Sequence, residues 1–495
     1  MSINFNTGYM PPGVYVQPVS TPTPTVAAIA GDVIAVVGPA QGWLTNTESG
    51  LFSTSTAAAL SKQGINTSSI VITDSSGNVQ ASSSYTVTQT GTAPATTTTI
   101  QLTQNSAMNS NTVYYVTYSY TDQNYYTPQV FTDQQTLFNT FGTPFTAAGG
   151  INSPLSLAGM LVLLRASVVV IMPTTDTGNV ATRTGLAGAY SALEAVDGID
   201  IIVPLPVGIN GTAAVPGDVP GVASDIASHC TLMSEPTVGY MRTAILGFES
   251  TVTVAPDTIA ASTASSRVLM PWPFAYGYYN GQAQQTLTVG SYYLAAQMAA
   301  MLASQPKSYG LTRKIVSGFV GIPNNILTTM TVPYKNQLSA AGVAVIEPAS
   351  GSGGALWCRH GTTTLTTNPM TRELSLVRCS DAIYEEIVLS YNQTGIIGDP
   401  ITSNTMDVIN STATGALEAL LSAQVIQGYT SPTATQDPVN PDVVNLTFGY
   451  SPSYPLNYLN VMYSVNNTTG TITPATSAST SGATSVYSGS SISSS

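Results

Sequence analysis

Apolar and polar positions change their spacing along the chain, and each change predicts a different kind of element. Between residues 127 and 305, apolar stretches of helical length alternate with short runs rich in valine and isoleucine. Residues 184–196 and 291–302 predict helices, whereas residues 168–172 and 199–203 predict buried strands. Because such alternation is typical of a sheet covered by helices, we expect a middle α/β domain over 127–305.

Residues 66–126 show a different pattern, in which apolar and Ser/Thr positions alternate with a period of two. The clearest run contains Tyr114, Val116, Tyr118 and Tyr120, and turn residues separate it from similar short runs upstream. A period of two places every second side chain on the same face of a strand. We therefore expect a small all-β insertion domain with a sandwich-like architecture, and a low-complexity linker is the alternative.

Both ends of the chain carry short strand-like runs bounded by prolines. Within residues 1–25, prolines flank one β-branched and aromatic run, Gly13-Val14-Tyr15-Val16. We therefore expect an extended N-terminal arm. Residues 441–465 predict a C-terminal arm of strands. Its apolar side chains are Leu456, Tyr458, Leu459, Val461 and Tyr463. Residues 466–495 are uncharged and rich in Ser, Thr and Gly, which predicts a disordered tail.

Charged residues are scarce. They make up 7% of the chain, against 43% apolar residues, and the net charge is −12. Soluble globular domains contain roughly 25% charged residues, so an isolated monomer of this composition is poorly protected against association. Ser, Thr, Asn, Gln and Tyr can enter an interface without the desolvation cost of an ion. The composition therefore favours a self-assembling protein and disfavours direct binding to nucleic acid.

The cysteines and the apolar stretches indicate where the chain is made. Cys230, Cys358 and Cys379 are an odd and widely spaced set, which argues against a disulfide framework and fits a reducing cytoplasm. The N-terminal residues lack the basic and apolar regions of a Sec signal peptide. Residues 155–172 are the longest apolar stretch, but Arg165 interrupts them. We interpret this stretch as a buried helix followed by a strand and expect no membrane insertion.

No constellation in the sequence indicates catalysis or a cofactor. The two histidines, His229 and His360, lie near cysteines, but neither spacing matches a zinc site, and Arg359 opposes a cation beside His360. Residues 351–354 form a glycine-rich run without the Lys-Ser/Thr of a phosphate loop, and a predicted strand follows it. We therefore predict no catalytic, cofactor-binding or metal-binding residues and no enzyme activity.

Basic residues are concentrated in one region. Residues 307–386 hold seven basic and five acidic residues, a local excess of two positive charges in a chain that is acidic overall. A stretch of this kind is either a partner surface or an ordinary solvated face.

Several segments, in a fixed order, resemble the tail sheath proteins of contractile bacteriophages, a family that includes the sheaths of R-type bacteriocins and contractile injection systems. Residues 11–16 resemble the Pro-Gly-Val-Tyr opening of that family, and residues 33–40 resemble the strand that follows it. Further matches are residues 336–343, the Gly/Trp/Arg segment 353–360, residues 372–378 and the terminal strand 454–461. The sequence departs from the family at Cys358 and His360, where glycine and threonine are usual.

The resemblance implies a multidomain α+β and α/β fold. An inner α/β sheath domain is built from both chain ends, beside the middle α/β domain and the inserted all-β outer domain. The expected boundaries are 1–25 for the N-terminal arm, 26–65 with 306–440 for the inner domain, 66–126 for the insertion, 127–305 for the middle domain, 441–465 for the C-terminal arm and 466–495 for the tail.

The resemblance also implies a structural subunit that polymerises helically around a tail tube and contracts to drive the tube through the host envelope for genome ejection. Terminal arms of adjacent copies complete one sheet by strand exchange. The expected partners are other copies of the chain in stacked hexameric rings, the tail tube, and the baseplate and tail terminator proteins. We place the tube-facing surface at Arg372 and Arg378. The expected location is the tail sheath of the virion, after assembly in the host cytoplasm.

Three alternatives stay open at this point. The sheath of a DNA-free contractile injection system or of an R-type bacteriocin shares every feature above. A surface adhesin explains the Ser/Thr-rich insertion but predicts an export signal. An α/β enzyme over residues 127–305 predicts a glycine-rich loop or a site that joins histidine and carboxylate.

Overall fold

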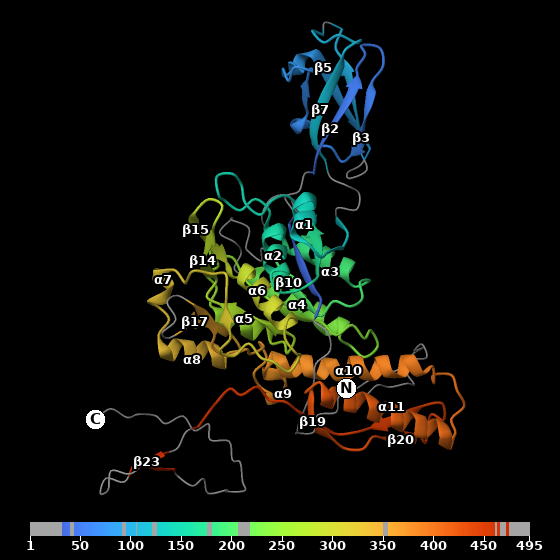
Figure 1. The fold of residues 1–495 in the computed structure, drawn as a ribbon, viewed down its shortest axis with the longest axis vertical. Helices are drawn as coiled ribbons and strands as arrows, with labels where there is room; N and C mark the ends of the chain where they lie inside the picture. Colours follow the sequence, from blue (N-terminus) through green and yellow to red (C-terminus); the bar gives the residue numbers. More distant parts are fainter. Residues whose placement is uncertain are drawn as a thin grey trace. The chain divides into compact units, whose positions relative to one another are not determined.

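The computed structural model describes most of the chain between residues 32 and 474. The described residues are 32–39, 44–91, 96–104, 106–120, 126–175, 181–205, 218–349, 355–460, 463–465 and 472–474. Contacts between residues divide the chain into two compact units, Met1–Pro455 and Leu456–Ser495 (Figure 1). The expected N-terminal arm, with Gly13, Val14, Tyr15 and Val16, lies outside the described residues.

A six-stranded sheet forms the centre of the first unit. Its order is β12 (Val268–Leu269), β11 (Thr243–Ile245), β10 (Ile201–Pro204), β1 (Ile34–Pro39), β9 (Val169–Thr174) and β8 (Gln129–Phe131). Neighbouring strands are parallel, except that β8 is antiparallel to β9. In β1, Ile34 lies opposite Ile201 on one side and Val169 on the other. Every residue of β1, β9 and β10 is buried, as expected for strands covered on both faces.

Helices cover both faces of this sheet. The first face packs against α1 (Gln134–Phe141), α2 (Pro154–Leu163) and α6 (Ser291–Ala303). The second face packs against α3 (Arg183–Leu193), α4 (Asp218–Met233) and α5 (Pro256–Thr263). Ile34 and Val36 point to the first face and Ala35 and Val37 to the second, because side chains alternate along a strand. The mixed α/β architecture predicted from the apolar pattern is confirmed.

The insertion is all-β, as predicted, but it is longer than predicted. It contains two three-stranded antiparallel sheets, β2–β7–β4 and β3–β6–β5, and two short 3₁₀ helices. Their bounds are β2 Leu44–Leu51, β3 Ala58–Gln63, η1 Thr67–Ser69, β4 Val71–Thr73, η2 Ser82–Ser84, β5 Tyr85–Thr90, β6 Thr97–Leu102 and β7 Val113–Tyr120. Ile72, Ile100, Val116 and Tyr118 lie in a core of the insertion's own.

The predicted start of the insertion at residue 66 is wrong. β2 pairs with β7 along its whole length, from Leu44 opposite Tyr120 to Leu51 opposite Val113. The sequence of β2 hides this pairing because threonine, asparagine, glutamate and serine occupy most of its positions. β2 and β3 therefore belong to the insertion, which runs from β2 to β7.

A smaller sheet and its helices extend the α/β body. The sheet has the order β13 (Pro271–Trp272), β17 (Ala344–Pro348), β18 (Leu356–Cys358) and β16 (Ile315–Val316). It is accompanied by the hairpin β14 (Ala275–Asn280) and β15 (Gln285–Gly290) and by α7 (Asn324–Leu327) and α8 (Val332–Ala340). Leu338 of α8 and Val345 of β17 share a hydrophobic cluster with Ala35 of β1.

The expected inner domain, residues 26–65 with 306–440, is therefore not one body. β1 lies at the centre of the middle sheet, because its apolar residues are buried between β9 and β10. The segment that contains α8 and β17 packs on the same α/β body. Only the residues from α9 onward form a separate layer with its own apolar cluster.

This C-terminal layer consists of helices and two-stranded sheets. Its elements are α9 (Pro369–Arg372), α10 (Leu374–Thr394), α11 (Ser403–Ser422), β19 (Ile426–Tyr429), β20 (Thr433–Gln436), β21 (Val444–Thr447) and β22 (Tyr450–Pro452). Figure 1 shows α10 and α11 side by side, and Ile387 and Leu417 are buried between them. α10 ends at Gly395, whose φ of 64° a glycine adopts without strain.

The second unit is described only in part. Residues 456–460 have no secondary structure, so the predicted strand over 456–465 is wrong there. β23 (Tyr463–Val465) pairs antiparallel with β24 (Ile472–Pro474), with Ile472 opposite Val465. β24 lies within residues 466–495, so the prediction of a disordered tail is wrong for these three residues. Val461 lies outside the described residues. Within the described ranges, no helix is long and apolar enough to cross a membrane.

Candidate functional site

The three cysteines and His229 are buried in the described part of the chain. Cys230, Cys358 and Cys379 are free and buried, and burial raises the pKa of each thiol to about 12. Burial, together with the neighbouring Arg242 guanidinium, lowers the pKa of His229 to about 4. Among the described residues, no group of three or more His, Cys, Asp or Glu side chains could hold a metal ion. These side chains act as neutral packing groups.

The most distinctive polar site is a buried charge cluster at the amino edge of the six-stranded sheet. It contains four carboxylates, those of Asp32, Asp200, Asp381 and Glu385, and three cations, those of Arg267, Lys307 and Arg378. Asp32 lies two residues before β1 and Asp200 directly precedes β10, and the two strands are neighbours in the sheet. Because the strands are parallel, both carboxylates lie at the same edge, where they repel each other unless a cation lies between them.

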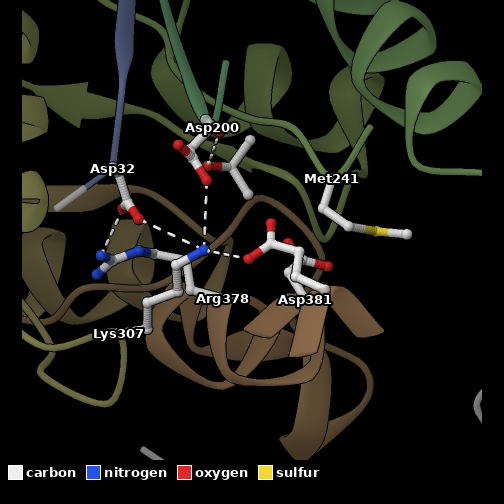
Figure 2. Close-up of a pocket in the computed structure, with 8 residues that line it drawn as sticks. Asp32, Asp200, Met241, Lys307, Arg378 and Asp381 are labelled. Carbon is white, nitrogen blue, oxygen red and sulfur yellow. Dashed lines mark hydrogen bonds and ion pairs between the residues drawn. The ribbon is translucent and has the colours of Figure 1, made fainter. Parts of the chain in front are cut away.

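Lys307 provides that cation. Its Nζ lies 3.6 Å from Asp32 Oδ1, 3.3 Å from Asp200 Oδ1 and 2.6 Å from Glu385 Oε2. Figure 2 shows the Lys307 ammonium directed at the carboxylates of Asp32 and Asp200. Burial works to lower the pKa of Lys307, but the three carboxylates outweigh it and raise the pKa above its ordinary value. Lys307 is therefore charged, and it links β1 and β10 to α10.

Arg378 of α10 makes a second link to β1. Its Nη2 donates to Asp32 Oδ2 at 2.5 Å and to the carbonyl oxygen of Leu302 at 3.0 Å. Leu302 lies in the last turn of α6, where carbonyl groups lack partners within the helix and a cation is favourable. Arg378 thus joins α10 to the end of α6 and to the start of β1.

Asp381 and Glu385 complete the cluster one and two turns further along α10. Asp381 accepts two hydrogen bonds of 2.9 Å from Arg267, one from each terminal nitrogen of the guanidinium. Burial raises the pKa of Glu385 to about 7, although Lys307 opposes the shift. Burial also raises the pKa of Asp200, again against Lys307. At neutral pH, Glu385 and Asp200 therefore hold a proton more readily than exposed carboxylates do. Their partial protonation brings the net charge of the cluster closer to zero.

The cluster is a packing site and not a binding cavity. The space among its side chains is about 10 Å³, at the lower limit of what one water molecule needs. Its ionic groups pair with one another at distances of 2.5–3.6 Å, and the Nε and Nη1 atoms of Arg378 are buried beside them without a hydrogen-bond partner among the described residues. We conclude that the cluster fixes α10 of the C-terminal layer against the α/β body.

The two residues predicted to face a tube have different positions. The prediction that Arg378 forms a partner surface is wrong for this conformation, because its side chain is 3% exposed and ion-paired with Asp32. Arg372 at the end of α9 is half-buried and remains a prediction. Among the arm residues, Leu456, Tyr458 and Leu459 are 81%, 73% and 79% exposed. The role of these side chains in strand exchange also stays a prediction.

The sequence itself contains a signal for this buried charge cluster. The chain has only 12 basic and 24 acidic residues, so a carboxylate one or two residues before an apolar strand stands out. Asp32 before β1 and Asp200 before β10 both follow this pattern. The buried carboxylates could therefore have been predicted as a pair that requires a cation, but not which cation supplies it.

The fold and this site together define a class: a multidomain α/β protein in which a β insertion and a helical C-terminal layer are attached to one central sheet, with buried charges between the layers. Comparison with known proteins gives a particular relative. The chain is 29% identical over 479 residues to the tail sheath protein of Mycobacterium phage Bxz1, a match that spans 93% of this chain and 78% of that protein. The chain is thus a homologue of a phage tail sheath protein, and the resemblance seen in its motifs is confirmed. No family model matches.

The solved structures to which the chain is similar have low sequence identity to it. A sheath tail protein from Desulfitobacterium hafniense is 10% identical with a TM-score of 0.42, over 89% of this chain and all of that one. A sheath tail protein from Listeria innocua is 12% identical with a TM-score of 0.45, over 86% of this chain and 93% of that one. A chain of the contracted anti-feeding prophage baseplate is 14% identical with a TM-score of 0.49, over 69% of this chain and 89% of that one.

Proposed function

We propose that the chain is the structural sheath subunit of a contractile phage tail and a component of the virion. The observation that carries this proposal is the homology to a phage tail sheath protein along almost the whole chain. The low content of charge supports it, because a polymer subunit must bury most of its polar surface against other copies without desolvating ions. In this role the chain holds no substrate and needs no cofactor.

Subunits join by exchange of terminal strands. The proposed acceptors are the two-stranded sheets β19–β22 and β20–β21 of the C-terminal layer. A two-stranded sheet is only marginally stable in water and leaves strand edges with unpaired backbone groups. The proposed donors are the run Gly13–Val16 and the segment that carries Leu456, Leu459 and Tyr463. The exposed apolar side chains at 456 and 459 support a donor role, because they are buried only if a partner covers them.

The assembled subunits form a helical sheath around a tail tube and shorten on triggering. The charge cluster supports this proposal, because it ties α10 to the α/β body and lets each copy move as one rigid piece while its arms bend. Energy for contraction is stored in subunit packing and needs no nucleotide. Arg372 is the remaining candidate for a contact with the tube. Assembly takes place in the host cytoplasm, and the baseplate and tail terminator proteins bound the sheath at its two ends.

Electron microscopy of the purified chain tests this function. We expect hollow helical tubes from the full-length protein. Deletion of residues 1–20 should leave folded subunits that no longer form tubes, because the donor strand is lost. Deletion of residues 476–495 removes a segment of equal length without a predicted strand and serves as the control, so it should leave tube formation intact. Stable monomers of the full-length chain would contradict the sheath function, and normal tubes from the first deletion would contradict strand exchange.

A further inference from the structure

Positive charge ends abruptly along the chain. Residues 379–495 contain no lysine or arginine but eight carboxylates: Asp381, Glu385, Glu386, Asp399, Asp407, Glu418, Asp437 and Asp442. The preceding residues, 307–378, contain seven basic residues and only two acidic ones. A charge separation of this size within one chain produces opposite electrostatic potentials over different parts of its surface.

Most of the C-terminal carboxylates lie on the surface without a cation. Asp381 and Glu385 are used in the buried cluster. Asp399, Asp407 and Glu418 are exposed on and beside α11, and Glu386 is half-buried on α10. No lysine or arginine of the described ranges lies within ion-pair distance of these four. We call Glu386, Asp399, Asp407 and Glu418 the acidic layer.

A surface of opposite sign lies on the small sheet. Ile315 of β16, Trp357 of β18 and Glu347 of β17 are direct neighbours across three strands and therefore share one face. The guanidinium of Arg313 lies 4.2 Å from the centre of the Trp357 ring, and Lys335 and Arg359 both contact Glu347. Two cations thus share the carboxylate of Glu347, and a third, that of Arg313, lies on the neighbouring Trp357 ring. We call Arg313, Lys335 and Arg359 the basic face.

The basic face is open to a partner. Arg313 is exposed, and Ile315 on the same face is 51% exposed. Arg313 contacts only an aromatic ring, so its charge is not neutralised by a carboxylate among the described residues. An exposed cation beside an exposed apolar side chain and a tryptophan is typical of an interface core, where Arg and Trp are enriched.

We propose that the acidic layer of one copy docks on the basic face of a second copy. This inference rests on the proposed function, in which the chain polymerises. A homopolymer supplies the two faces in equal number, which matches an acidic layer whose four carboxylates form no ion pair with a lysine or arginine of the described ranges. Contact between two different faces is heterologous, so it does not close on itself unless the rotation completes a ring, and it can propagate along a helix. Because the contact is electrostatic at its rim, salt weakens it.

Charge reversal on the two faces tests the docking directly. The first variant, Asp407→Lys with Glu418→Lys, replaces two carboxylates of the acidic layer by cations on one side of α11, because the two positions are eleven residues apart on that helix. The second variant, Arg313→Glu with Arg359→Glu, makes the basic face acidic. In each variant the reversed side chains carry the same sign as the face they would dock on, and we expect its critical concentration for tube formation to rise at least about tenfold. An equimolar mixture should form tubes again, because each face then meets its opposite on the other variant.

Controls separate this result from simple loss of folding or of function. Glu194→Lys with Glu235→Lys changes the net charge by the same amount as the first variant, but in the α/β body, and should assemble like the wild type. Arg313→Glu alone alters one exposed side chain and should show a smaller defect of the same kind. If the wild type and the control form tubes and the first variant does too, docking through the acidic layer is wrong while the sheath function stands. A mixture of folded variants that stays unassembled also overturns the docking, and a wild type that never assembles overturns both proposals.

Discussion

At the scale of single residues, scarcity of charge makes each ion informative. The chain carries few charges, yet seven of them meet in one buried cluster at the amino edge of the sheet. Buried ion pairs contribute little net stability when they are complete, but they leave a costly unpaired charge when one partner is removed. Lys307 is the most connected member, since it contacts three carboxylates.

Replacement of Lys307 by methionine should therefore be severe. We expect Lys307→Met to lower the free energy of unfolding by about 3–5 kcal/mol, because Asp32, Asp200 and Glu385 lose their shared cation. Urea unfolding followed by tryptophan fluorescence measures the loss. Lys314→Met is the matched control, because Lys314 lies 5.8 Å from the centre of the Tyr309 ring and should cost less than about 1 kcal/mol. Equal losses in both variants would show that the cluster does not stabilise the fold.

At the scale of elements, β1 determines how the body is assembled. It is the central strand of the sheet, and its parallel partners β9 and β10 are distant in sequence. Close packing at its end leaves no room for a side chain at Gly38, where an added Cβ atom would lie 2.1 Å from the carbonyl oxygen of Leu205. The residue type at this position is therefore dictated by the strand pairing and not by a turn.

A pair of glycine substitutions tests this packing. Gly38→Ala should reduce the free energy of unfolding by about 1–3 kcal/mol or make the protein insoluble, because the backbone of β1 or of residue 205 must shift. Gly188→Ala lies in α3 with nothing within 4 Å of the added atom. It should be neutral or stabilise the protein by up to about 1 kcal/mol, since alanine favours a helix. Thermal denaturation followed by circular dichroism compares the two, and an unaffected Gly38→Ala variant would contradict the close contact.

At the scale of the whole molecule, the hydrophobic clusters show which parts are independent. The core of the insertion, with Ile72, Ile100 and Val116, shares no residue with the two clusters of the α/β body. The insertion enters the chain between β1 and β8 and interrupts no strand of the central sheet. We interpret it as a domain added to a body that is complete without it.

Deletion of the insertion tests this interpretation. Replacement of residues 44–120 by a short Gly/Ser linker should leave the central sheet folded, because flexible loops of different length differ little in closure entropy. Calorimetry should then show the unfolding transition of the α/β body with nearly unchanged midpoint, and the transition of the insertion should disappear. Loss of the remaining transition would mean that the insertion is needed for the fold of the body.

The amino-acid sequence alone determined the elements and the family resemblance. Most of the helices and buried strands of residues 127–305, the β character of the insertion and the sheath motifs were predicted, because periodicity and local composition reflect which side of an element is apolar. The strand β8, the helix α5 and the hairpin β14–β15 were not predicted. The tertiary structure decided which elements meet. β1 pairs with β9 and β10, β2 joins the insertion, and Arg378 turns inward to Asp32. These outcomes depend on pairings between residues far apart in the chain, and a local pattern cannot specify such partners.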